Sequence, residues 1–351
     1  MKALVKTAPG PGNMELQDRP VPEIEDDDLL IEVRAAGICG SDLRTRKYGN
    51  SRNLRTPVIL GHEFAGVICK VGKNVKDFYV GQRVVSDNTG YLCGKCDNCA
   101  RGNYMMCEHR VGLGVGMDGG FTNYVRIPGQ LLSVNPHSLF TIPKTVSFEE
   151  ASLLDPLCNA YKAVVEESHL MPGQDVVVFG LGTLGQMAVA VANLMGAANI
   201  IAVNRSDNLL RFDTAKTLGA THCVCSTKQN VLGEIARITS GEMVPVIIDC
   251  AGSNEILGLA LDILQKGGEF IKVGYDSSPV PFSLDAYINK GIRIQGHFAY
   301  DYVGWKNCLR LLSIGKLNVK PVITEHLPLD DWEKGFDDQA AGRAIKVIFE
   351  F

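Results

Sequence analysis

The sequence predicts an α/β protein of two domains, one of which contains a doubly wound parallel sheet. At 351 residues, the chain is too long for one simple hydrophobic core. Residues 176–179 form a short run of valine and phenylalanine that leads through a glycine-rich turn into a helical pattern. From there to residue 275, apolar runs alternate with helical segments, which is typical of right-handed parallel β-α units.

The composition is that of a soluble globular protein, with 46% hydrophobic and 21% charged residues. The net charge is −4 and no block of five or more basic residues occurs, which argues against nucleic acid or an anionic membrane as a partner. Residues 176–204 carry no charge, but four glycines and a change from β-like to helical pattern indicate a buried strand–helix–strand segment there. Because the N-terminus lacks a secretory signal, we expect a cytoplasmic protein.

Two segments near the N-terminus contain strong zinc ligands. The segment "GICGSDLR" contains the thiol of Cys39, and "GHEFAG" contains the imidazole of His62. A catalytic zinc ion needs a third protein ligand, for which the carboxylates of Glu63 and Asp155 are the candidates. Taken alone, such a cysteine and histidine are more often a buried thiol and a core histidine, so these residues by themselves leave their role open.

The segment "CGKCDNCARGNYMMC" packs four cysteines into fifteen residues. The chain has 11 cysteines, an odd number, and no export signal, so a disulfide framework is not expected. The C-x2-C-x2-C-x7-C spacing favours a tetrahedral zinc site over an iron–sulfur cluster or four free thiols. A closed four-sulfur shell leaves no place for substrate, so we interpret this site as structural. Its ligands are Cys93, Cys96, Cys99 and Cys107.

The segment "VVVFGLGTLG" contains a G-x-G-x-x-G motif at Gly180, Gly182 and Gly185. The motif alone is weak, but here it follows a β-like run and opens an amphipathic helix, which is the context of a dinucleotide fingerprint. The glycines allow a tight turn and close approach of the pyrophosphate, and the helix N-terminus supplies N–H donors. The expected cofactor-binding residues are Gly180, Gly182, Thr183, Leu184, Gly185, Asn204, Arg205, Val273 and Gly274.

The end of the next β-like run bears on the choice of nicotinamide cofactor. An enzyme specific for NAD carries an aspartate or glutamate there to hold the ribose diol. Here "NIIAV" runs into Asn204 and Arg205 instead. Without the repulsion of a carboxylate, and with a guanidinium for the 2′-phosphate, NADP(H) is favoured, and NAD(H) stays possible.

With these motifs together, the chain resembles zinc-dependent medium-chain dehydrogenases of the sorbitol, L-threonine and galactitol-phosphate dehydrogenase group. "GHEFAGVICKVGKNV" fits the zinc alcohol dehydrogenase signature G-H-E-x2-G-x5-G-x2-V at every fixed position. The order of C-G-S-D, G-H-E, the four-cysteine segment, a carboxylate-Pro-Leu segment and the nucleotide turn also matches. The resemblance covers essentially the whole chain.

The resemblance implies a chaperonin-10-like irregular β-barrel catalytic domain, residues 1–156 and 294–351, and a Rossmann domain, residues 157–293. It implies two zinc ions per chain, one catalytic and one structural, and a homodimer or homotetramer. The reaction would be the reversible oxidation of a secondary alcohol to a ketone, with zinc as Lewis acid and the nicotinamide as hydride acceptor. The substrate would be a small alcohol or ketone.

The family's site residues carry over to matching positions of this sequence. Cys39 and His62 would bind the catalytic zinc, with Asp155 or Glu63 as the carboxylate ligand. Asp42 resembles the carboxylate that orients the zinc-bound histidine, and Ser41 resembles the hydroxyl that takes the proton of the alcohol.

One position departs from the family pattern. Many relatives have a histidine two places after the aspartate, where this chain has Arg44. The proton relay beyond Ser41 therefore stays open. Together with Tyr48, Arg52 and Arg55, Arg44 is compatible with a hydrophilic or phosphorylated substrate, although such residues are more often simply solvated.

Two alternative functions require different residues. A zinc-free reductase of the same fold would lack the Cys39 and His62 ligands and the four-cysteine segment. A non-catalytic zinc-ribbon interaction protein would have no use for the nucleotide fingerprint.

Overall fold

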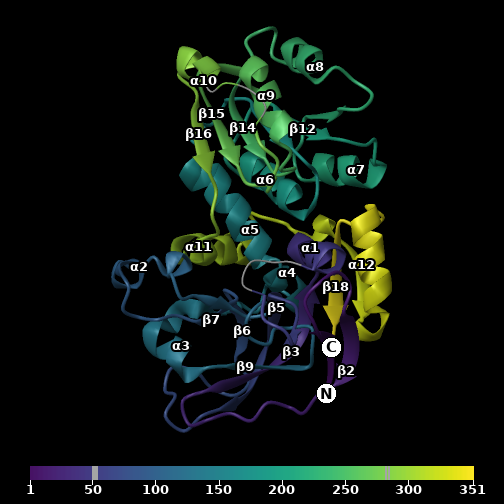
Figure 1. Cartoon of the computed structure of the whole chain (residues 1–351). Coiled ribbons are helices and arrows are strands. Elements are labelled where there is room, and N and C mark those ends of the chain that lie inside the picture. Colours follow the sequence, from purple (N-terminus) through teal and green to yellow (C-terminus); the bar gives the residue numbers. More distant parts are fainter. Residues whose placement is uncertain (50–53, 281–282, 284) are drawn as a thin grey trace. The chain divides into compact units, whose positions relative to one another are not determined.

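The computed structural model describes residues 1–49, 54–280, 283 and 285–351 (Figure 1). The chain forms two compact units. Unit 1 comprises Met1–Asp155, Asp301–Ser313 and Ile323–Phe351, and unit 2 comprises Pro156–Tyr300 and Ile314–Val322. The domain limit expected between residues 293 and 294 falls inside a strand, β16 (Arg293–Gly296).

Unit 1 is built around a seven-stranded sheet in which long strands from distant parts of the sequence pair. Its order is β10-β6-β5-β3-β18-β17, and β9 pairs with β3 off this path. All pairs are antiparallel except β17 with β18. The strands are β3 (Leu29–Gly37), β5 (Glu63–Val71), β6 (Arg83–Ser86), β9 (Tyr124–Ile127), β10 (Leu139–Thr141), β17 (Ile323–Pro328) and β18 (Lys346–Glu350).

Two smaller sheets complete the strands of unit 1. A three-stranded antiparallel sheet has the order β2 (Met14–Asp18), β1 (Lys2–Lys6), β4 (Val58–Ile59), and β7 (Thr89–Tyr91) pairs with β8 (Val111–Gly112). The helices are α1 (Gly40–Tyr48), α2 (Asp97–Ala100), α3 (Gly129–Val134), α4 (Phe148–Ser152), α11 (Tyr302–Ser313) and α12 (Trp332–Ala341). Helix α5 (Leu154–Tyr161) begins in unit 1 and continues in unit 2.

The core of unit 1 joins the two ends of the chain. Phe121 packs edge-on against Phe349 of β18, with ring centroids 5.2 Å apart, and against Phe336 of α12 at 6.2 Å. All three side chains are fully buried. Aromatic rings bury large apolar areas and favour this edge-to-face geometry. These contacts hold the C-terminal strand β18 against the core of unit 1.

Unit 2 confirms the predicted doubly wound parallel sheet. Its six strands are all parallel in the order β13-β12-β11-β14-β15-β16. They are β11 (Val176–Phe179), β12 (Ile200–Asn204), β13 (His222–Cys225), β14 (Val244–Asp249), β15 (Leu264–Lys272) and β16. The helices between them are α6 (Thr183–Leu194), α7 (Leu209–Thr217), α8 (Val231–Ile238), α9 (Asn254–Ile263) and α10 (Asp285–Lys290).

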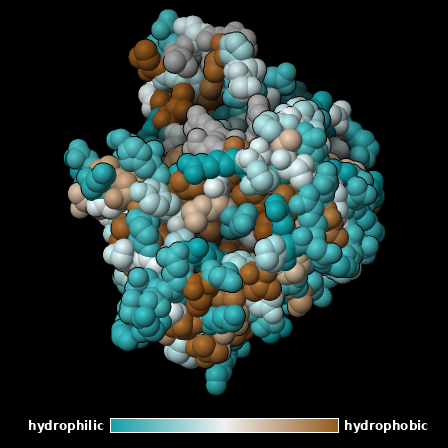
Figure 2. All heavy atoms as spheres, turned by 60° about the horizontal axis from the view of Figure 1, so that its bottom comes forward, coloured by the Kyte–Doolittle hydropathy of each residue, from teal (hydrophilic) through white to brown (hydrophobic). Residues whose placement is uncertain are grey.

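The uncharged segment 176–204 is a strand–helix–strand unit, as predicted. All residues of β11 and β12 are buried, which explains why neither strand shows an alternation of polar and apolar residues. Across the described part of the chain, no helix has the length and apolar character needed to cross a bilayer. Figure 2 shows hydrophilic side chains over much of one face, with hydrophobic side chains in small scattered groups.

Candidate metal centres and nucleotide-binding turn

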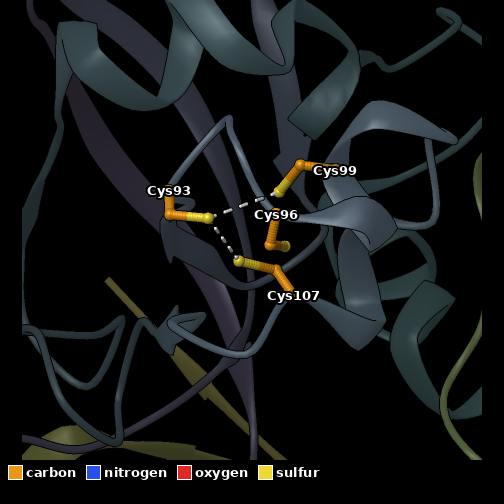
Figure 3. Close-up of side chains that lie close together, drawn as sticks. All are labelled: Cys93, Cys96, Cys99 and Cys107. Carbon is orange, nitrogen blue, oxygen red and sulfur yellow. Dashed lines mark hydrogen bonds between the residues drawn. The ribbon is translucent and has the colours of Figure 1, made fainter.

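Four cysteine sulfurs converge in one lobe of unit 1 (Figure 3). We call residues 92–110 the four-cysteine lobe. Cys96 precedes α2, Cys99 lies on it, and Cys107 follows the short 3₁₀ helix Tyr104–Met106. The Sγ atom of Cys93 lies 3.9 Å from that of Cys99 and 3.6 Å from that of Cys107.

These separations fit a metal ion and exclude disulfides. A disulfide would bring two sulfurs to about 2.05 Å. Four sulfurs held about 2.3 Å from one zinc ion lie about 3.8 Å apart at the corners of a tetrahedron. An iron–sulfur cluster would place its own atoms between the thiolates and spread them further. The residues therefore fit a single ion in a closed four-sulfur shell.

The thiols of the lobe also differ in acidity. Hydrogen bonds from the backbone N–H groups of Lys95 and Cys96 lower the pKa of Cys93 to about 6. Burial, followed by the neighbouring sulfurs of Cys107 and Cys96, raises the pKa of Cys99 to about 12. Four thiolates at this spacing repel one another, and a divalent cation offsets that repulsion.

A second group of ligand atoms lies where β3 ends and β5 begins. Gly37, the last residue of β3, pairs with Glu63, the first residue of β5. Cys39 follows the end of one strand and His62 precedes the start of the other, so the register brings them together. The ligand atoms of Cys39, His62 and Glu63 lie within 4.8 Å of one another. Three ligands of these types fit a tetrahedral zinc with one open position.

Asp42 lies close to both candidate ligands, Cys39 and His62. Its Oδ2 accepts a hydrogen bond from the backbone N–H of Cys39 at 2.9 Å, and its Oδ1 lies 3.8 Å from Nδ1 of His62. That Nδ1 atom is buried and has no hydrogen-bond partner among the described residues. Burial alone would lower the pKa of His62, but Cys39 and Asp42 raise it well above its usual value. At 3.8 Å, the Asp42 carboxylate influences the imidazole through its charge rather than through a hydrogen bond.

Glu63 also forms a buried ion pair with Lys346. The ammonium of Lys346, in β18, donates hydrogen bonds to Oε2 of Glu63 and, at 2.8 Å, to the carbonyl of Ile38. A Cβ atom on Gly37 would lie only 2.8 Å from that Oε2 and 3.0 Å from Cε of Lys346. Burial raises the pKa of Glu63, although the Lys346 ammonium opposes this. Gly37 is thus the residue that leaves room for the pair.

The two candidate carboxylates, Glu63 and Asp155, lie in different places relative to Cys39 and His62. Glu63 joins Cys39 and His62, whereas Asp155, near the start of α5, lies outside that group of ligand atoms. Oδ2 of Asp155 accepts a hydrogen bond from the side-chain amide of Asn88 at 2.5 Å.

The glycine-rich turn of unit 2 is shaped by close backbone contacts. Gly180 has φ +84°, and a Cβ atom on Gly185 would lie 1.7 Å from its carbonyl oxygen. Gly182 is the N-cap of α6, and Thr183 and Leu184 are the first residues of the helix. A Cβ atom on Gly182 would meet no other atom within 4 Å. The first and third glycines are therefore needed by the fold itself, and the second leaves open space at the helix N-terminus.

The polar end of β12 adjoins this turn. The side-chain amide oxygen of Asn204 accepts a hydrogen bond from the N–H of Leu181 at 3.4 Å, and its Nδ2 donates to the carbonyl of Ser206 at 2.8 Å. The next residue, Arg205, is exposed. The side chain of Asn204 thus fixes the turn, and the guanidinium of Arg205 lies at the surface.

The remaining predicted cofactor residues follow β15. The N–H groups of Val273 and Gly274 donate to the carbonyl of Asp249 at 3.0 and 2.8 Å. A Cβ atom on Gly274 would lie 2.4 Å from the backbone nitrogen of Gly252. Lys272 donates to the Asp249 carboxylate at 2.7 Å and to the carbonyl of Gly252 at 2.6 Å. These contacts clamp the ends of β14 and β15 together.

Other predicted residues lie around α1. Ser41 is half-buried in the first turn of the helix, two residues after Cys39, and Arg44, Tyr48 and Arg55 are exposed. Arg52 lies outside the described residues.

Three residues of the metal region were not found from the sequence. Lys346 interrupts the apolar run "AIKVIF", and a lysine in such a run was a usable signal of a buried ion pair. Asn88 and Arg110 had no local signal, because neither is part of a recognised motif.

Comparisons with known proteins find matches to both parts of the chain. The model of the alcohol dehydrogenase GroES-like domain matches residues 25–137, and that of the zinc-binding dehydrogenase matches residues 183–313. The GroES-like match confirms the predicted chaperonin-10-like domain.

Similarity also extends along the whole chain. The chain is 41% identical to the uncharacterized zinc-type alcohol dehydrogenase-like protein YdjL of Escherichia coli K12, and the alignment covers 100% of this chain and 99% of the relative. It is 34% identical to D-arabitol-phosphate dehydrogenase of Enterococcus avium, covering 100% and 97%.

Two solved structures of similar fold contain a nicotinamide cofactor. An Escherichia coli CFT073 alcohol dehydrogenase complexed with NADH gives a TM-score of 0.87 at 26% identity, covering 100% of this chain and 99% of the other. A putative zinc-binding dehydrogenase of Sinorhizobium meliloti 1021 bound to NADP gives 0.88 at 27% identity, with the same coverage. This chain therefore belongs to the zinc-binding alcohol dehydrogenase family, whose members are oxidoreductases that act on CH–OH groups with nicotinamide cofactors.

Proposed function

We propose that this protein reversibly oxidises a secondary alcohol, of the polyol or sugar-phosphate kind, to a ketone at a zinc site formed by Cys39, His62 and a carboxylate. The observation that carries the proposal is the convergence of Cys39, His62 and Glu63 within 4.8 Å, at a distinct place from the closed four-cysteine lobe. One set of residues can hold an ion and still leave a position for substrate, and the other cannot.

Each residue of this site has a separate role. A zinc ion bound here supplies Lewis-acid polarisation of the alcohol oxygen. Ser41, in the first turn of α1, takes the proton that the alcohol loses. Asp42 acts on the imidazole of His62 through its charge, since its Oδ1 lies 3.8 Å from Nδ1 and makes no hydrogen bond to it. Glu63 and Asp155 share the carboxylate role, and the Lys346 ammonium holds Glu63 when it is not a ligand.

The four-cysteine lobe holds the second zinc ion in this proposal. Its role is structural, because four sulfurs complete the tetrahedral shell. It keeps a loop in place that has only the short helix α2 and one 3₁₀ turn of its own.

The substrate class rests on two observations. A relative that is 34% identical over the full chain is a D-arabitol-phosphate dehydrogenase. Exposed Arg44 and Arg55 supply guanidinium groups suited to a phosphate or to several hydroxyl groups.

For the cofactor, we propose a preference for NADP(H). The neutral side chain of Asn204 ends β12, and Arg205 is exposed directly after it. A 2′-phosphate would meet a guanidinium and no carboxylate at the end of this strand.

A panel of secondary alcohols and ketones, assayed by nicotinamide absorbance with each cofactor, tests the activity. We expect turnover with at least one polyol or sugar phosphate, loss of turnover on removal of the exchangeable zinc, and its recovery when zinc is added back. Turnover that persists in a protein lacking the zinc of the Cys39 site would favour a zinc-free reductase instead.

The family resemblance also supports a homodimer or homotetramer, and we propose that the protein is cytoplasmic. Light scattering of the purified protein measures the assembly directly.

A further inference from the structure

The carboxylate of Asp155 is held by a hydrogen-bonded chain that leads to the four-cysteine lobe. The side-chain amide of Asn88 donates to Oδ2 of Asp155 at 2.5 Å. The amide oxygen of Asn88 accepts a hydrogen bond from the guanidinium of Arg110. Arg110 also donates from Nε to Oγ1 of Thr89 at 3.4 Å.

Asparagine is suited to the middle of this chain. Its amide offers both an acceptor, which faces the cation of Arg110, and a donor, which faces the anion of Asp155. Bonds to charged groups on both sides polarise the amide in the same direction, and each strengthens the other. An aspartate in place of Asn88 would repel Asp155, and an alanine would connect nothing.

The backbone links the same residues to the lobe. The N–H of Arg110 donates to the carbonyl of Cys107 at 3.1 Å, and Cys107 is one of the four sulfur ligands. The N–H of Leu113 donates to the carbonyl of Asn88 at 2.8 Å. Strands β7 and β8, which flank the lobe on either side in sequence, pair with each other. Asn88 itself has φ +54°, a left-handed conformation kept by these neighbours.

We propose that Asn88 and Arg110 are positioning residues that transmit the state of the four-cysteine lobe to Asp155. A metal in the lobe fixes Cys107, which fixes Arg110. The guanidinium then orients Asn88, and its amide sets where the Asp155 carboxylate lies relative to Cys39 and His62. Loss of the lobe metal therefore loosens the catalytic metal site. This inference rests on the proposed function.

Metal release measures the coupling without an assay of turnover. Zinc leaving the purified protein is followed with a colorimetric chelator, and the phase that Cys39→Ser lacks belongs to the catalytic site. We expect Arg110→Gln and Asn88→Gly to speed this phase by about 10- to 100-fold, as the loss of groups that support metal ligands does. Glycine is chosen at position 88 because it suits the left-handed φ. Arg110→Lys, which keeps a cationic donor, falls between wild type and Arg110→Gln.

Arg101→Gln is the matched control, since Arg101 is an exposed arginine of the same lobe. We expect it to release both ions at wild-type rates. In addition, we expect Arg110→Gln to lower kcat by a larger factor than it changes KM. In the proposed function, the Asp155 carboxylate acts at the reacting centre.

A double-mutant cycle tests whether the coupling passes through Arg110. Cys96→Ser opens the lobe, and if its effect reaches the catalytic site through Arg110, then combining it with Arg110→Gln releases catalytic zinc no faster than the faster single variant. Effects that multiply, or an unchanged catalytic phase in both Arg110→Gln and Asn88→Gly, overturn the inference while leaving the proposed function intact. A wild-type protein that binds only one zinc per chain, held in the four-cysteine lobe, and that still turns over its substrate would instead remove the proposed function itself.

Discussion

The ammonium of Lys346 donates a hydrogen bond to the carboxylate of Glu63 in the interior of unit 1, where the two side chains are 0% and 1% exposed. The residues are 283 positions apart in the sequence. The pair joins the C-terminal strand β18 to the first residue of β5, beside the candidate catalytic metal site.

Removing the cation of this pair should destabilise the protein strongly. Lys346→Met leaves the Glu63 carboxylate buried without its partner, and we expect a loss of about 3–5 kcal/mol in the free energy of unfolding. Urea denaturation of the wild type and the variant measures this. The double variant Lys346→Met/Glu63→Gln, in which neither side chain is charged, should recover most of the loss. If the two single losses simply add in the double variant, the pair does not act as a unit.

The two metal sites should respond differently to the loss of one thiol. Cys39→Ser should abolish turnover, retain one zinc per chain and keep the wild-type unfolding transition. Cys96→Ser should lower the unfolding temperature, because the lobe depends on its metal for shape. Elemental analysis and thermal denaturation check both variants. The opposite result, with Cys39→Ser unfolded and Cys96→Ser stable, would mean that the roles are reversed.

The glycines of the nucleotide turn should separate folding from binding. In Gly185→Ala, the new methyl group meets the carbonyl of Gly180, so we expect a loss of stability of about 1–3 kcal/mol or more. In Gly182→Ala, no atom lies within 4 Å of the methyl group, so stability should stay at the wild-type value while cofactor affinity falls. Thermal denaturation and fluorescence titration with NADPH measure the two quantities. Unchanged affinity in a stable Gly182→Ala would argue against pyrophosphate binding at this turn.

The preference for NADP should depend on Arg205. A guanidinium–phosphate bond is worth about 1.5–3 kcal/mol, which corresponds to a factor of about 10 to 150 in relative efficiency. We therefore expect Arg205→Ala to lower the ratio of kcat/KM for NADP to that for NAD by this factor. Lys228→Ala is a useful control, because Lys228 is also exposed but is paired with Asp207. A ratio that does not fall in Arg205→Ala would sink the proposed preference.

The carboxylate of Asp276 should contribute stability that depends on pH. Hydrogen bonds from the N–H groups of Ser278 and Asn254 lower the pKa of Asp276 from 3.8 to about 2 in the folded protein. Since the folded pKa lies below the unfolded one, this stability is fully present above about pH 4 and is lost as the pH falls toward 2. Asp276→Asn should therefore be less stable than wild type at pH 7, and the difference should narrow in acid. If the difference in the free energy of unfolding between the two proteins does not become smaller below pH 4, the lowered pKa of Asp276 is not its origin.

Much of the candidate site could be predicted because its residues sit in short local motifs. Cys39 and His62 each lie in a contiguous segment that resembles a known signature, and the four cysteines of the lobe are close in sequence. The glycine-rich turn is likewise local, since its spacing and its strand and helix neighbours are all within a few residues. Asp155 and Glu63 were both foreseen as carboxylate candidates, but which of them lies with Cys39 and His62 depends on the register of β3 against β5.

The doubly wound sheet, the two groups of candidate ligands and the glycine-rich turn could be predicted from the sequence alone, because hydrophobic periodicity and ligand spacing are properties of short stretches. The contacts of Lys346 with Glu63, and of Asn88 with Arg110 and Asp155, became visible only in the folded chain. Those contacts join segments that are far apart along the chain, and their geometry follows from strand pairing and side-chain packing that no local pattern encodes. The chemistry could thus be foreseen from the motifs, and the side chains that hold it in place could not.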